Sequence, residues 1–177
     1  NNLDFIVYDY LAEITMSIMA RARAKDPEKG YAVDFVSSVL KLNLRQIADQ
    51  KIKILSNAGG VNPEACAKAI RELIKDLKLD LKVAVVLGDE LIAKKDKLSD
   101  QKLKEMYSET DFPKIENIAS INAYLGAFPI AQALNDGADI VITGRSVDSA
   151  VTLAACIYSF GWQEDEYNKL AGGSLAG

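Results

Sequence analysis

A strand, a glycine loop and a helix in direct succession occupy residues 51–70, and this succession restricts the fold more than any other segment. Ile52, Ile54 and Leu55 form a short apolar run of the kind found in buried strands. The loop S-N-A-G-G-V follows at 56–61, and Asn62 with Pro63 is a favourable helix start. A glycine loop before a helix offers N–H groups and the positive end of the helix dipole to an anion. The segment therefore predicts a strand–helix unit with a ligand at its loop.

The same alternation recurs along the chain. Strands are predicted at 3–8, 81–87 and 139–143, with a shorter one at 115–121. Helices are predicted at 14–24, 33–40, 63–77, 129–136 and 150–159, and Asn43 with Gln46 resembles a capping box opening a further short helix. The nearly continuous Val and Leu run at 81–87 suits a strand covered on both faces. These patterns predict an α/β fold, a three-layer, mostly parallel sheet with helices on both faces, as in Rossmann-like proteins.

The chain of 177 residues is long enough for a single α/β domain or part of one. It begins with Asn rather than Met and ends in G-G-S-L-A-G, where no closing helix or strand is predicted. We therefore expect a fragment of a larger domain. Residues 94–114 mix charges of both signs densely, which predicts either a solvated helical excursion or a lid over a ligand.

Composition excludes several functions. The net charge of −4 and the lack of a basic face argue against nucleic acid as a partner. The longest apolar run, 150–158, is far shorter than the roughly 20 residues that a membrane span needs. No signal peptide is recognised, so we expect a cytoplasmic protein in which Cys66 and Cys156 are reduced, buried thiols. The sequence contains no histidine, the commonest general base and zinc ligand.

Polar residues follow every predicted strand, and in open parallel sheets ligands bind beyond the carboxyl ends of the strands. These residues are Asp9, Tyr10 and Glu13, then Ser56, Asn57, Gly59, Gly60 and Asn62, then Asp89, then Asn122 and Tyr124, and finally Thr143, Arg145, Asp148 and Ser149. The pattern predicts one site at this rim of the sheet. Arg145 is the strongest candidate, because its planar guanidinium suits a carboxylate or phosphate.

Structural roles remain open for the same residues. Asn57 and Asn62 are also typical of turns and caps, Asp148 or Ser149 of the N-cap of the last helix, and Asp89 of a strand end. Arg145 is equally suited to a salt bridge with Asp9, Asp89 or Asp148. The glycine loop also lacks the spacing of dinucleotide folds and the Gly-Lys-Ser/Thr ending of P-loops.

Five collinear segments carry a family resemblance: YDYLAEITMSIMARA at 8–22, SNAGGVNP at 56–63, VAVVLGDEL at 83–91, NAYLGA at 122–127 and ADIVITGRSVDSA at 138–150. They resemble the acyclic terpene utilisation family, whose AtuA-like proteins were once a domain of unknown function. The resemblance implies a cytosolic α/β protein encoded beside acyl-CoA carboxylases in the catabolism of branched acids. The chain departs from the family spelling at Leu87, Glu90 and Ser146.

Three hypotheses follow. In the first, the chain is an enzyme or enzyme component that binds a branched acyl-CoA or its free acid. The anionic group of the ligand is bound by Asn57, Gly59, Gly60 and Arg145, and Asp89 or Asp148 is the general acid or base. In the second, the chain is a non-catalytic partner of an acyl-CoA carboxylase. Under both hypotheses we expect the protein to form an oligomer. In the third, Asp9, Glu13, Asp89 and Asp148 hold a divalent metal ion.

Overall fold

The computed structural model describes residues 3–177 and contains a sheet of four parallel strands. The strands are β1 (Phe5–Tyr8), β2 (Lys53–Ser56), β3 (Val83–Val86) and β4 (Ile140–Thr143), in the spatial order β1-β2-β4-β3. All four residues of the inner strand β4 are buried, which explains its unbroken apolar sequence. The predicted α/β, Rossmann-like class is confirmed.

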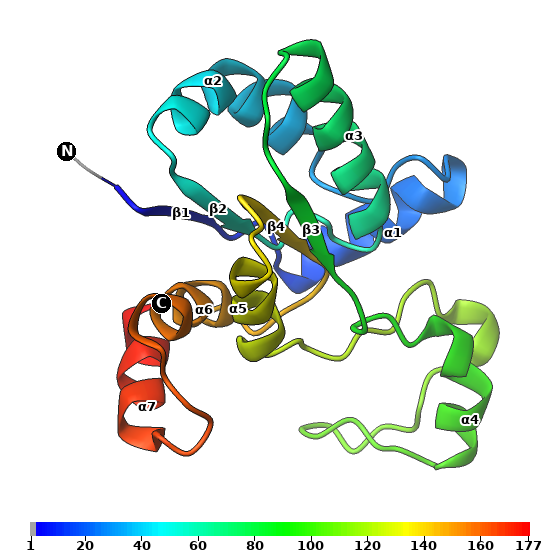
Figure 1. Ribbon diagram of the computed structural model, residues 1–177. Helices are drawn as coiled ribbons and strands as arrows, with labels where there is room; N and C mark the ends of the chain where they lie inside the picture. The colour runs from blue at the N-terminus through cyan, green and yellow to red at the C-terminus, as the bar shows by residue number, and fades with distance from the viewer. Residues whose placement is uncertain (1–2) are drawn as a thin grey trace.

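Helices cover both faces of the sheet (Figure 1). On one face lie α1 (Glu13–Lys25), the π-helix η1 (Phe35–Leu40), α2 (Lys41–Asp49) and α3 (Pro63–Asp76). On the other lie α5 (Phe128–Asn135) and α6 (Ala150–Phe160), with α7 (Tyr167–Ala176) packed on α6. Because strand side chains alternate, Ile54 and Ile140 enter the first core, whereas Leu55 and Val141 enter the second. The sheet is therefore the middle layer of three.

The start of α3 follows the sequence prediction. The side chain of Asn62 accepts a hydrogen bond from the Ala65 N–H (3.4 Å) and occupies the N-cap position before Pro63. Its amide nitrogen also donates to Pro27 O and Lys29 O, both at 2.8 Å. Asn62 therefore caps the helix and fixes the preceding loop against it.

The predicted break between two helices near Asn43 is wrong. The π-helix η1 continues directly into α2, so Asn43 lies within a helical run rather than at its beginning. Its side-chain nitrogen donates to Val39 O at 2.8 Å. The asparagine thus bonds the carbonyl one turn before it, an alternative to capping that the Asn-x-x-Gln pattern does not distinguish.

Two further predictions are wrong. Residues 115–121 form no strand; the 3₁₀-helix η3 (Ile115–Asn117) begins this segment. The chain also has a last helix, α7, where the glycine-containing sequence predicted none. Within α7, a Cβ on Gly173 would lie 2.7 Å from Leu153 Cδ1 and 2.8 Å from Trp162 Cζ3. Glycine is used there because α7 approaches its neighbours closely.

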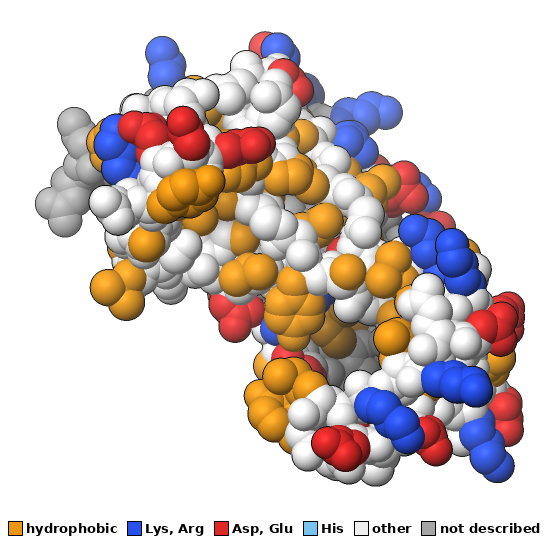
Figure 2. Space-filling view, turned by 90° about the horizontal axis from the view of Figure 1, so that it is seen from below, with side chains coloured by type: hydrophobic (Ala, Val, Ile, Leu, Met, Phe, Trp, Pro, Cys, Tyr) orange, Lys and Arg blue, Asp and Glu red, His pale blue; other side chains and the backbone are white. Residues whose placement is uncertain are grey.

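Residues 88–127 leave the sheet after β3 and return before α5, and we call them the excursion (Figure 1). They contain the 3₁₀-helix η2 (Ile92–Lys94), α4 (Lys95–Asp100) and η3. The base of the excursion is closed by hydrogen bonds from Leu91 N–H to Ile121 O and from Ala123 N–H to Asp89 O, both 2.7 Å. In Figure 2 the excursion projects beside a hollow in the surface. Its regular helix is shorter than the predicted 94–114.

Across residues 3–177, no helix has the length and apolar character needed to cross a membrane.

Candidate functional site

The carboxyl ends of the four strands bring predicted site residues to one rim. Asp9 follows β1, Asn57 follows β2, Asp89 follows β3 and Arg145 follows β4. The Asn57 amide donates to Asp9 Oδ1 (2.6 Å), and its oxygen accepts the N–H of Tyr10 (2.7 Å). Asn57 is fully buried, so it joins the first two loops from inside the protein.

Asp89 joins three segments of the rim. Its buried carboxylate accepts the backbone N–H of Arg145 (2.9 Å) and the side-chain amide of Asn122 (2.8 Å). Its backbone carbonyl accepts the N–H of Ala123. These bonds hold the loop after β4 and the base of the excursion against the end of β3.

The guanidinium of Arg145 is buried, with 4% of the residue exposed. It donates to Leu11 O (2.7 Å), Asp148 Oδ1 (2.9 Å), the hydroxyl of Tyr124 (2.9 Å) and Glu13 Oε1 (3.3 Å). Burial alone would lower the pKa of Arg145, but the hydrogen bond to Tyr124 and the charge of Asp148 raise it overall. Arg145 therefore remains a cation whose donors are engaged by the protein.

Tyr124 packs against the buried Arg145 and is itself partly exposed to solvent. The Arg145 Cζ lies 4.1 Å from the centroid of the Tyr124 ring, a cation–π contact. The Tyr124 hydroxyl donates to Glu13 Oε1 at 2.7 Å, and about half of this tyrosine is exposed. That hydrogen bond, more than the nearby charge of Arg145, lowers the pKa of Glu13. We call Glu13, Tyr124, Arg145 and Asp148 the Arg145 cluster; its two carboxylates, on Glu13 and Asp148, reach the surface.

The predicted anion loop is packed within the protein. The N–H groups of Gly60, Val61 and Asn62 donate to Asn57 O (3.1 Å), Gly30 O (2.9 Å) and Gly59 O (2.8 Å). A Cβ on Gly59 would lie 2.6 Å from Pro63 Cβ. Gly60 has a φ of +55° and lies against Met19. The glycines thus allow α1 and α3 to approach this loop.

The remaining predicted residues lie around α6. Ser149 occupies its N-cap position without a side-chain hydrogen bond to the helix, and Asp148 precedes it. The four carboxylates predicted as metal ligands bind different protein groups instead. Asp9 accepts from Asn57, Glu13 and Asp148 accept from Arg145, and Asp89 accepts from the Arg145 N–H and the Asn122 amide. Within residues 3–177, no group of three or more His, Cys, Asp or Glu side chains is arranged to hold a metal ion.

Two cavities border the rim, and their arginines were not predicted as site residues. The α1 cleft, of about 360 Å³, lies between α1 and the excursion and is lined by Ser17, Arg21, Phe112, Pro113 and residues 117–121. The α3 pocket, of about 240 Å³, is lined by Arg23, residues 61–64 and residues 87–90. Arg23 pairs with Glu90 and donates to Val61 O.

The sequence contains a pattern that indicates which α1 residues lie on the side of the cleft. Glu13, Ser17 and Arg21 are spaced by four residues, which places them on one side of a helix. The sequence does not tell which side of α1 the excursion covers, because that contact joins segments about one hundred residues apart.

The sequence model of the acyclic terpene utilisation family protein AtuA matches residues 1–177. No curated protein and no solved structure matches the chain. The match spans the sheet, both helical layers and every residue of the rim. The chain therefore belongs to the acyclic terpene utilisation family AtuA.

Proposed function

We propose that this protein binds a branched acyclic carboxylic acid or its coenzyme A ester beyond the carboxyl ends of the strands, in the α1 cleft. The observation that carries the proposal is the charge of the cleft. Of the described residues that line it, Arg21 alone is charged. Arg21 is exposed and makes no ion pair or side-chain hydrogen bond within residues 3–177. A guanidinium without a partner, in a cleft that has no other charged lining residue, suits a carboxylate or phosphate.

The walls of the α1 cleft suit the apolar body of such a ligand. Phe112, Pro113, Ile118 and Ile121 face it from the excursion. A cleft with apolar walls and a few polar groups is the usual form of a small-molecule site.

The α3 pocket fits an anion less well. Glu64, Asp89 and Glu90 line it, and the charge of Arg23 is opposed by its pairing with Glu90. Three carboxylates around one guanidinium repel a negative ligand. The α1 cleft therefore replaces the glycine loop as the anion site in this proposal.

The Arg145 cluster meets α1 through Glu13, which lies at the start of the helix on the same side as Ser17 and Arg21. From Glu13 to Arg21 the helix rises by about 12 Å. A ligand whose carboxylate pairs with Arg21 extends along α1 toward Tyr124 and Glu13. In an enzyme of this design, Tyr124, Glu13 and Asp148 are the exposed groups beside the reacting atoms, while Asp89 holds Arg145 in place.

The test is calorimetric titration with citronellic acid, its coenzyme A ester and coenzyme A alone. Arg21→Ala is expected to weaken binding of the acid or the ester by at least about tenfold, the loss expected for a charge-assisted hydrogen bond. Lys25→Ala is the matched control, because it removes the same charge one turn further along α1 and does not line the cleft. Equal losses in both variants, or none in Arg21→Ala, would contradict the proposal. If coenzyme A alone binds as tightly as the ester, the affinity for the ester comes from its nucleotide portion.

A second candidate, a partner of an acyl-CoA carboxylase, is favoured by the tip of the excursion. Met106 is 79% and Tyr107 is 86% exposed, on a segment that projects from the body. Large apolar side chains on a projecting segment are typical of protein contacts. Met106→Ser with Tyr107→Ser is expected to abolish co-purification with the carboxylase while ligand binding in the α1 cleft is kept. Retained co-purification would reject this candidate.

A further inference from the structure

The outer edge of β3 has unpaired backbone groups. Lys82 O accepts the N–H of Ile140 (3.0 Å), so the backbone groups of residues 82, 84 and 86 face β4 and those of 83, 85 and 87 face outward. Arg71 donates to Val83 O at 2.9 Å. Within residues 3–177, the outward N–H and C=O groups of Val85 and Leu87 have no hydrogen-bond partner. An edge of this kind is a template for another strand.

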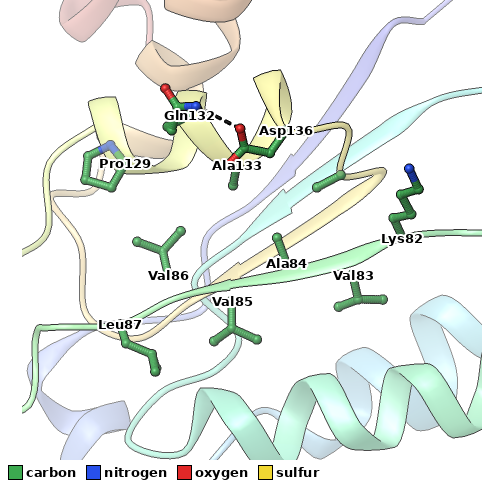
Figure 3. Close-up of a pocket in the computed structure, with 11 residues that line it drawn as sticks. Lys82, Val83, Ala84, Val85, Val86, Leu87, Pro129, Gln132, Ala133 and Asp136 are labelled. Atoms are coloured by element: carbon green, nitrogen blue, oxygen red, sulfur yellow. Dashed lines mark hydrogen bonds between the residues drawn. The ribbon is translucent and has the colours of Figure 1, made fainter.

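A groove runs along this edge. It measures about 470 Å³ and is lined by residues 82–87 of the strand and by Pro129, Gln132, Ala133 and Asp136 near α5. Figure 3 shows Ala84 and Val86 pointing toward α5, and Val83, Val85 and Leu87 pointing toward the opposite helical layer. Leu87 is 54% exposed. The edge therefore offers apolar side chains on both sides of its free backbone groups.

We propose that a second copy of this chain docks on this edge, its β3 antiparallel to the first about a two-fold axis at Val86. In that register Val85 of each copy lies opposite Leu87 of the other. Antiparallel residues that face each other exchange their N–H and C=O groups, so both reciprocal pairs are satisfied. The bond from Arg71 to Val83 O is kept. The four-stranded sheet then continues across both copies.

The charges at the ends of β3 favour a second copy in this orientation. Lys82 is exposed before the strand, and Glu90, which pairs with Arg23 and keeps 39% of its side chain exposed, follows it. Antiparallel pairing brings the Lys82 end of one copy beside the Glu90 end of the other, whereas parallel pairing would align like charges. Since Glu90 also lines the α3 pocket, Lys82 of the second copy adds a positive charge at the mouth of that acidic pocket.

The test is sedimentation velocity on the 177-residue chain and two proline variants. Val85→Pro removes an outward N–H and no bond to β4, so it blocks the interface and keeps the ladder. Val7→Pro is the matched control, because Asp4 O accepts from Lys53 N–H and residue 7 therefore faces outward on the opposite edge strand, β1. The wild type and Val7→Pro are expected to sediment as dimers and Val85→Pro as a monomer with unchanged circular dichroism.

Charge variants test the proposal without any change to the backbone. Lys82→Glu is expected to raise the dimer dissociation constant by about tenfold, and adding Glu90→Lys to restore it. A monomeric wild type at high micromolar concentration, or a Val85→Pro chain that remains dimeric, would overturn the proposal. Capture of a different polypeptide by the β3 edge of a monomeric wild type would overturn it equally.

Discussion

The carboxylate of Asp89 occupies the space that a side chain on Gly144 would need. A Cβ at position 144 would lie 2.6 Å from Asp89 Cγ, closer than any van der Waals contact. The same carboxylate accepts the N–H of Arg145, the next residue. The absence of a side chain at 144 therefore lets Asp89 set the path of the chain leaving β4, and with it the position of the Arg145 guanidinium.

A substitution of Asp89 is expected to cost stability first. Asp89→Asn removes a charge-assisted acceptor from the buried N–H of Arg145 and the partly buried amide of Asn122, and should lower the free energy of unfolding in urea by about 2 kcal/mol. Asp148→Asn is the comparison, because 65% of the Asp148 side chain is exposed and its pair with Arg145 is worth at most about 1 kcal/mol. An Asp89→Asn chain that keeps its stability but loses a measured activity would instead assign Asp89 an acid/base role.

Arg145→Lys is expected to lower the melting temperature even though the charge is kept. A lysine ammonium has three donors and no planar face, so it cannot serve Leu11 O, Asp148, Tyr124 and Glu13 together or stack on the Tyr124 ring. The expected loss is about 2 kcal/mol, because the buried cation at position 145 would be left with fewer hydrogen bonds. Arg21→Lys, on the exposed side of α1, should change stability by less than about 0.5 kcal/mol. An unchanged melting temperature for Arg145→Lys with weaker ligand binding would make Arg145 a ligand-contacting residue.

The strands could be predicted because each is a short apolar run bounded by turn residues. The convergence of Asp9, Asn57, Asp89 and Arg145 on one rim followed from the parallel sheet alone. Two of the failed predictions have a common cause. Residues 115–121 depend on a contact with an earlier segment, since Ile121 O accepts the N–H of Leu91, and α7 depends on its packing against α6, where Gly173 meets Leu153. Local propensity does not include such contacts.

The partners of the rim residues could not be predicted for a similar reason. A sequence shows that Gly59 and Gly60 permit close approach, but not whether a ligand or another part of the protein approaches. Here Pro63 and Met19 do. Likewise, Arg21 and Arg23 are two residues apart on α1 and line different cavities, because each is met by a different part of the chain after β2.

Gly60→Ala is expected to destabilise the protein for two reasons that controls can separate. The φ of +55° strains any L-residue, and a Cβ there would meet Met19 and lie 2.8 Å from Gly30 O. Gly161→Ala carries only the first penalty, since its φ is +64° but nothing lies within 4 Å of the added Cβ. Gly126→Ala carries neither.

Denaturation in urea should rank the losses as Gly60 above Gly161 above Gly126, with about 1 kcal/mol for the strain at Gly161. A Gly60→Ala chain as stable as Gly161→Ala would show that Met19 moves aside without cost. In that case the glycine loop is not fixed by its packing, and a ligand role for its backbone would regain support.

The two cysteines are expected to differ in reactivity although both lie on helices. Cys66 faces the core from α3, and burial raises the pKa of its thiol to about 12. Because the thiolate is the reactive form, Cys66 should not react with Ellman's reagent in the native protein at about pH 8. Cys156, on α6, is partly exposed and should react. Cys156→Ser is therefore expected to leave no fast-reacting thiol until urea is added, whereas Cys66→Ser leaves the fast one intact. Rapid labelling of Cys66 in the native Cys156→Ser chain would show that α3 separates from the sheet, and the packing of the glycine loop described above would not hold in solution.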